Sequence, residues 1–256
     1  MQLDLNQLML GKATRIKDKE YFSTEAYVTP FIERMSKFTN EFIINAKPAD
    51  QISLTHDGTY NFDDMIYNRV NIEAVLPDEY AYEGHKQVVG FVYALDTRKP
   101  VVKLYAGGLR CACLNLCVFD PQALQVNALE PESAINYNFI DNCMSMTSTI
   151  SQKLNKLAEI EWTKEQCFNE LGTWIDRCIN SKFTNDFGTI KLAESTPIEA
   201  YKNLFYNDKS PYFTDKGIVT GFDAYQSFTD HICNGRSADL TNRFEKVLLV
   251  SKIMGI

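Results

Sequence analysis

The alternation of apolar and polar residues between Ile66 and Leu76 constrains the fold of this chain more than any other feature. In an extended strand, residues two apart point to the same face. Two sets of residues therefore face opposite ways: Ile66, Val70, Ile72, Ala74 and Leu76 on one face, and Tyr67, Arg69, Asn71 and Glu73 on the other. Because one set is apolar and the other mostly polar, the pattern predicts a strand with one buried and one wet face.

Further segments extend this strand into a sheet. Residues 86–96 and 101–106 are rich in valine and aromatic residues, and the loop DTRKP separates them. Gly107 and Gly108 are expected to end the second of these strands, and residues 109–119 to form the next. We predict an antiparallel meander of three to five strands, to which a short segment near Ile52 can add.

The sequence on both sides of the strands has the period of helices. Aromatic and apolar residues four, three and four apart predict a helix that begins near Pro30: Phe31, Met35, Phe38 and Phe42. Beyond Pro131 the helical period continues to the last residue. The predicted helices are residues 132–157, a helix to Asn180 opened by a capping box of Thr163 and Gln166, a short helix after Thr196, Pro197 and Glu199, a helix opened by Thr220 and Asp223, and one from Ser237.

These elements predict an α+β fold in two regions. Residues 1–130 form an N-terminal helix with an antiparallel β-sheet, and residues 131–256 form a helical region that packs on the sheet. The loops at residues 182–195 and 206–217 are expected to be flexible joints. A chain of 256 residues is long enough to bury a sizeable core.

The composition indicates a folded protein without membrane segments. The chain is 45% hydrophobic and 23% charged, and its longest apolar run is far below the ~20 residues that a membrane helix needs. The first ten residues, MQLDLNQLML, lack the pattern of a signal peptide. We therefore expect a cytoplasmic protein with reduced cysteines.

Three of the seven cysteines lie on one face of the strand predicted at 109–119: Cys111, Cys113 and Cys117. A straight strand spreads its sulfur atoms along a line, whereas structural zinc draws ligands from paired turns. We interpret these cysteines as core residues, with a redox switch and a metal site as the alternatives. The other four stand singly on predicted helices: Cys143, Cys167, Cys178 and Cys233. No cofactor and no metal are predicted.

No catalytic motif is present. The three histidines, His56, His85 and His231, have no metal-ligand spacing, and neither a nucleophile elbow nor a glycine-rich phosphate loop occurs. We therefore interpret the chain as a binding protein rather than an enzyme.

The charge of the chain is unevenly placed. Its net charge is −7, yet residues 84–117 carry five basic residues and one acid, so that this window is +4. Aromatic residues interleave with the basic ones, as in proteins that hold single-stranded nucleic acid by phosphate contacts and base stacking. The predicted nucleic-acid-binding residues are Lys86, Arg98, Lys99, Lys103, Arg110, Phe91, Tyr93 and Tyr105. The alternative is that the basic residues only keep the sheet soluble.

Two stretches resemble a known family. GGLRCACLNL is similar to the R-x-x-C-x-N strand of a phage and plasmid family of unknown function, with Arg110, Cys113 and Asn115 at the matching positions. VTGFDAYQSFTDHI and NRFEKVLLVSKIM resemble the closing helix pair of that family, with Phe222 in place of a tyrosine. The resemblance implies a phage or mobile-element origin and an infected host cell as the place of action.

The predicted architecture is also similar to that of phage single-strand annealing proteins. In that group a strand-rich unit followed by a helix forms a DNA-binding groove, and the subunits join into rings or filaments. The similarity implies a single-stranded DNA-binding accessory of recombination or replication that forms a homo-oligomer. The alternative is a phage protein-interaction module that binds a host or phage protein, with Tyr80 and Tyr82 in a possible contact loop.

Overall fold

The computed structural model describes residues 14–16, 19–21, 24–48, 67–77, 85–94, 101–110, 116–119, 121–128, 138–145, 147–234 and 241–256. The chain divides into two compact units, and each of them takes several segments. The first unit comprises residues 1–81, 86–106 and 124–145, and the second comprises residues 82–85, 107–123 and 146–256. The predicted boundary after residue 130 lies where a strand-rich part of the sequence gives way to a helical part. The compact units do not follow this boundary, because the first unit extends beyond it and the second unit includes segments that precede it.

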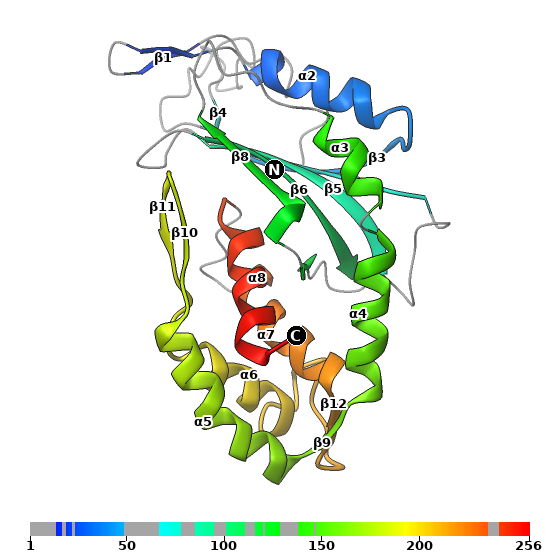
Figure 1. The fold of residues 1–256 in the computed structure, drawn as a ribbon, viewed down its shortest axis with the longest axis vertical. Helices are drawn as coiled ribbons and strands as arrows, with labels where there is room; N and C mark the ends of the chain where they lie inside the picture. Colours follow the sequence, from blue (N-terminus) through cyan, green and yellow to red (C-terminus); the bar gives the residue numbers. More distant parts are fainter. Residues whose placement is uncertain are drawn as a thin grey trace, which may run out of the picture. The chain divides into compact units, whose positions relative to one another are not determined.

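The first unit is built on an antiparallel sheet (Figure 1). Its strands follow the order β3-β4-β5-β6, and β8 pairs with β6. The bounds are β3 Glu41–Pro48, β4 Tyr67–Val75, β5 His85–Ala94, β6 Val101–Arg110 and β8 Leu124–Ala128. The remaining elements are the hairpin of β1 Thr14–Ile16 and β2 Lys19–Tyr21, with the helices α2 Thr24–Met35 and α3 Phe139–Ser145. The predicted α+β fold with an antiparallel sheet is confirmed.

The prediction of a wet face on β4 is wrong. Both faces of this strand are buried from Val70 to Leu76, and the exposed fractions of Asn71 and Glu73 are only 2% and 1%. Ile72 lies opposite Phe91 on the face that α2 covers, while Glu73 lies opposite Gly90 on the other face. The polar residues of β4 therefore belong to the interior.

The face of the sheet that carries Glu73 is filled by the ring of Tyr105, which approaches Gly90 closely. A Cβ atom added to Gly90 would lie 2.0 Å from Cζ of Tyr105, so that the ring of Tyr105 occupies the space that a side chain on Gly90 would need. From there the Tyr105 hydroxyl donates a hydrogen bond of 2.8 Å to Oε1 of Glu73. Only glycine on the middle strand allows a tyrosine from β6 to reach across to β4.

Two boundaries in the first part of the chain differ from the predictions. The helix α2 runs from Thr24 to Met35 and contains Pro30 inside it, whereas Phe42, predicted on the same helix, lies in β3 and pairs with Ala74. The strand β6 continues through Gly107 and Gly108 and ends at Arg110. A Cβ on Gly107 would lie 2.8 Å from Cδ1 of Leu116, so this glycine permits the close approach of β7 Leu116–Cys117 rather than ending the strand.

The second unit is mainly helical, as predicted (Figure 1). Its helices are α4 Thr147–Glu159, α5 Lys164–Asn180, α6 Thr196–Phe205, α7 Gly221–Asn234 and α8 Arg243–Met254, with the 3-10 turn η3 at Pro121–Ala123. The short strands are β9 Glu161–Thr163, β10 Phe183–Asn185, β11 Gly188–Ile190 and β12 Ile218–Thr220. The hairpin of β10 and β11 replaces part of the loop predicted at 182–195.

Local capping signals place two of these helices. Gln166 N donates to Oγ1 of Thr163, and Thr163 N donates to Oε1 of Gln166, which is the predicted capping box at the start of α5. Thr220 and Asp223 make the equivalent reciprocal bonds at the start of α7. Helix α6 begins at Thr196, one residue earlier than its cap prediction implies, because Ser195 rather than Thr196 takes the cap position.

None of the described helices is long and apolar enough to cross a membrane.

Replacing Gly90 with alanine should destabilise the protein. The added methyl group meets the Tyr105 ring, and overpacking of this kind costs about 1–3 kcal/mol of unfolding free energy. Urea unfolding measures the change. The matched control is Gly172→Ala in α5, measured at a protein concentration low enough for the chain to be monomeric. A Cβ there meets nothing within 4 Å, and helix propensity should raise stability by up to about 1 kcal/mol. Equal effects of the two substitutions would contradict the packing of Tyr105 over Gly90.

Candidate functional site

The predicted nucleic-acid-binding residues fall into three groups. Arg98 and Lys99 lie outside the described residues, and the Arg110 side chain is likewise outside the description. The other five are placed on β5 and β6: Lys86, Phe91, Tyr93, Lys103 and Tyr105. The sheet does not bring these five onto one face, because Phe91 and Tyr93 point away from the face that holds Tyr105.

Phe91 and Tyr93 form the contact of the sheet with α2. The rings of Phe31 and Phe91 lie 5.3 Å apart, and those of Tyr27 and Tyr93 lie 6.0 Å apart. All four side chains are buried. Pairs of aromatic rings at such distances stabilise packing beyond the burial of their area. A base could stack on Phe91 or Tyr93 only after α2 had moved off the sheet.

Lys103 and Tyr105 share the opposite face, as predicted, but both are buried. The Tyr105 hydroxyl lies 2.8 Å from Glu73 Oε1 and 3.3 Å from Asn71 Oδ1. Lys86 is half-buried, and its Nζ forms an ion pair of 3.0 Å with Glu41. These contacts occupy the cationic and aromatic groups within the protein. The described part of the basic window therefore does not form an open, cationic stacking surface.

The side chains of four cysteines are described, and all are buried: Cys117, Cys167, Cys178 and Cys233. Burial, with a smaller contribution from Glu170, raises the pKa of the Cys167 thiol to about 12. Burial also raises the pKa of Cys178. Thiols held protonated in this way are poor nucleophiles and poor metal ligands. Among the described residues, no group of three or more His, Cys, Asp or Glu side chains is placed to hold a metal ion. Cys111 and Cys113 lie outside the described residues.

Exposed aromatic residues gather elsewhere, on α5 and α6 of the second unit. Phe168 is 62% exposed and Tyr206 is 65% exposed. Both rings contact the buried ring of Tyr201, at centroid distances of 6.1 and 5.9 Å, and Phe205 lies 5.1 Å from Tyr201. We call Phe168, Tyr201, Phe205 and Tyr206 the aromatic cluster. Because two buried rings support the two exposed ones, the cluster presents a firm apolar surface to solvent.

A lysine borders the aromatic cluster. Nζ of Lys164 lies 4.0 Å from the centroid of Tyr206 and 5.8 Å from that of Phe205. A cation over an aromatic face is attracted by the ring quadrupole. Burial raises the pKa of the Tyr201 phenol, and Tyr206 adds to the increase. The Tyr201 phenol is therefore held in its neutral form.

An apolar row on α5 continues from the aromatic cluster. The side of the helix next to its buried stripe carries Phe168, Leu171, Gly172, Ile175 and Ile179. Leu171 and Ile175 are half-buried, and Ile179 is 46% exposed. The buried stripe itself consists of Cys167, Trp174 and Cys178. Since one stripe suffices to pack a surface helix on its own core, the second, exposed row is surplus to folding.

Gly172 lies in the middle of the apolar row and has no role in the fold of the chain. It is exposed, it has no positive φ, and a Cβ atom there would meet nothing within 4 Å. Glycine inside a helix costs about 1 kcal/mol relative to alanine. A glycine on an exposed apolar row leaves room for a second backbone to approach closely.

Sequence reasoning did not single out these residues. The amphipathic period of α5 was visible, but the sequence does not tell which of two neighbouring apolar stripes faces the core. Comparisons with protein-family models, with curated proteins and with solved structures gave no match for this chain. The resemblance to the phage and plasmid family therefore stays a prediction.

Removing the Tyr105 hydroxyl should destabilise the protein through Glu73. In Tyr105→Phe the buried carboxylate loses a donor, which costs about 1–3 kcal/mol. The measurement is a double-mutant cycle of Tyr105→Phe with Glu73→Gln in urea unfolding. We expect a coupling energy of at least about 0.5 kcal/mol. Additive effects of the two substitutions would show that the hydrogen bond does not contribute.

Proposed function

We propose that this chain is a protein-binding module and that its binding surface is the aromatic cluster together with the apolar row of α5. The observation that carries the proposal is the exposure of Phe168 and Tyr206 on a support of buried rings. Tyrosine and phenylalanine are enriched in the cores of protein interfaces. Rigid aromatic side chains lose little entropy on binding, which makes them effective anchors.

The charge around this surface favours a protein over a nucleic acid. Helix α5 contains two basic and three acidic residues, and on α6 Lys202 forms an ion pair of 2.9 Å with Glu199. Binding of a phosphate backbone depends on several uncompensated cations. A near-neutral apolar surface with one bordering lysine lacks them, whereas it matches the polar rim and apolar centre of a protein interface.

The partner that we propose is a second copy of this chain, with α5 packed against α5. A twofold axis passing near Gly172 would place the apolar row of one chain on the same row of the other, which is the self-complementary arrangement of most homodimers. In an antiparallel pair Lys164 of one helix lies near the C-terminal end of the other, which carries Asp176 and Arg177. Gly172 then stands at the crossing point, where the helix axes come closest.

Single-stranded DNA is the alternative ligand. The pairing of Lys164 with the exposed Tyr206 ring, a cation beside a ring on which a base could stack, favours this ligand. An annealing or replication accessory would use such a surface at low salt. Variants of Lys164 and Gly172 distinguish the two ligands, because phosphate binding depends on the lysine and helix packing depends on the glycine.

Self-association should be concentration-dependent and should depend on Gly172. We expect Gly172→Ala and Phe168→Ser to weaken dimer formation by tenfold or more, measured by sedimentation equilibrium, since each added or lost group at an interface centre costs on the order of 1–2 kcal/mol. The matched control is Thr173→Ala, on the polar side of the same helix. Like Gly172→Ala, this substitution raises the helix propensity of α5, but it should leave the dimerisation constant unchanged.

The outcome separates three cases. A monomer at all concentrations, with no binding of a labelled single-stranded oligonucleotide, overturns the proposed surface. Oligonucleotide binding that falls with salt and with Lys164→Ala, but not with Gly172→Ala, would replace the protein partner with nucleic acid. A dimer that Gly172→Ala leaves intact while raising stability would show that α5 is not the contact.

A further inference from the structure

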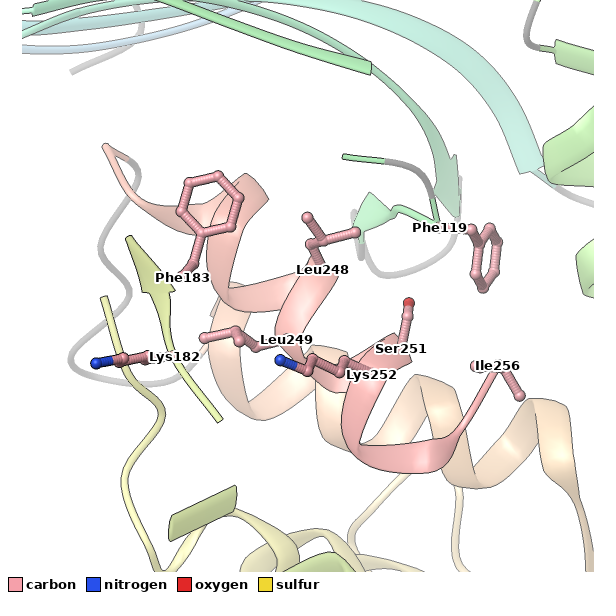
Figure 2. A pocket seen from close by; sticks show the side chains of 8 residues that line it. All are labelled: Phe119, Lys182, Phe183, Leu248, Leu249, Ser251, Lys252 and Ile256. Atoms are coloured by element: carbon pink, nitrogen blue, oxygen red, sulfur yellow. The ribbon is translucent and has the colours of Figure 1, made fainter. Parts of the chain in front are cut away.

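The second unit contains a pocket apart from the aromatic cluster (Figure 2). Its volume is about 360 Å³, within the range of small-molecule sites. The pocket is lined by residues of α8, of the segment after β7 and of the start of β10: Phe119, Lys182, Phe183, Leu248, Leu249, Ser251, Lys252 and Ile256. All of these residues belong to the second unit, so the site is complete within it.

The walls of the pocket are mostly apolar. In Figure 2 the rings of Phe183 and Phe119 lie on either side of the α8 side chains Leu248 and Ser251. Phe119 and Phe183 are half-buried, and so is Leu248. Apolar side chains that line a concave site without filling it leave surface in contact with water, and an apolar ligand would remove that contact.

Hydrogen bonds hold one wall of the pocket in place. Oγ of Ser251 donates to the carbonyl oxygen of Val118 at 2.6 Å. The Tyr225 hydroxyl accepts from the Val118 N–H at 3.0 Å, and the Tyr225 ring stacks on Phe119 at 5.2 Å. Both polar groups of Val118 are therefore fixed, and the adjacent Phe119 ring is positioned by stacking. A preformed wall lowers the entropy that ligand binding has to overcome.

Two ammonium groups border this apolar space. Lys182 and Lys252 are exposed lining residues, and within the described part of the chain neither has an ion pair. No acidic side chain lines the pocket. The charge that complements such a rim is negative, and a ligand that satisfies both parts of the site joins an apolar body to an anionic group.

We infer that this pocket binds a small amphipathic anion, with the apolar body between Phe119, Phe183 and Leu248 and the anionic group at Lys182 and Lys252. The volume holds on the order of a dozen non-hydrogen atoms at the volume per molecule of liquid water. A medium-chain carboxylate such as decanoate has this size and charge. The inference does not depend on the proposed protein partner, because the two surfaces share no residue.

Isothermal titration calorimetry with decanoate tests the site directly. We expect saturable binding of one decanoate per chain, with a Kd on the order of a millimolar or tighter for a ligand of this size. Decyltrimethylammonium has a similar chain and the opposite charge, and it should bind at least about tenfold more weakly. Equal binding of the two amphiphiles would overturn the assignment of the anionic end.

Charge-reversal variants locate the site. Lys182→Glu and Lys252→Glu change exposed residues, so the fold should be retained, and each should weaken decanoate binding on the order of tenfold. Leu248→Glu puts a carboxylate among the apolar walls and should abolish binding. The matched control is Lys156→Glu, on an exposed position of α4 that does not line the pocket. The inference is overturned if decanoate does not bind, or if Lys156→Glu weakens binding as much as Lys252→Glu does.

Phe168→Ser keeps this test separate from the proposed function. It removes an exposed ring of the aromatic cluster and leaves all residues of the pocket in place. Decanoate should bind this variant as it binds the original chain. Loss of decanoate binding in Phe168→Ser would show that the amphiphile occupies the aromatic cluster, and would overturn the assignment to the pocket.

Discussion

The reach of Tyr105 across Gly90 to Glu73 is the contact on which the sheet of the first unit depends. It links three strands at once, because a side chain of β6 passes over β5 and bonds to β4. The same contact gives a buried carboxylate a hydrogen-bond donor, which lowers the cost of its burial. It also decides the role of the predicted binding residues. Tyr105 cannot be both the cover of this face and a free stacking platform.

The sequence predicted the elements that local interactions determine. The capping box of Thr163 and Gln166 and the pair of Thr220 and Asp223 are satisfied within one helical turn, and both helices begin where these residues indicate. Strand β4 likewise forms where the alternation predicts a strand, although both of its faces are buried. The errors concern non-local contacts. The apolar spacing of Phe38 and Phe42 suits a helix, but pairing of β3 with β4 places Phe42 in a strand.

The candidate site could not be predicted from the sequence, and the reason is again that it depends on non-local contacts. A period of apolar residues in α5 shows that the helix has an inner side, but Cys167, Trp174 and Cys178 form one apolar stripe and Phe168, Ile175 and Ile179 form another beside it. Contacts with α6 and α8 determine which stripe is covered. The aromatic cluster also unites rings from two elements, with Phe168 more than thirty positions before Tyr201, and these rings meet only in the folded chain.

Gly172 links stability to function in this protein. A residue that weakens its own helix by about 1 kcal/mol, in a place where the fold has room for a side chain, is an inconsistency between local propensity and structure. Such inconsistencies tend to occur where a protein trades stability for activity. The exposed row around Gly172 has a similar cost, since Phe168 and Ile179 leave much of their apolar surface in contact with water. A second helix that covers the row offsets both the low helix propensity of Gly172 and the exposure of the apolar side chains. The glycine lets the two backbones come close enough for the flanking side chains to bury one another.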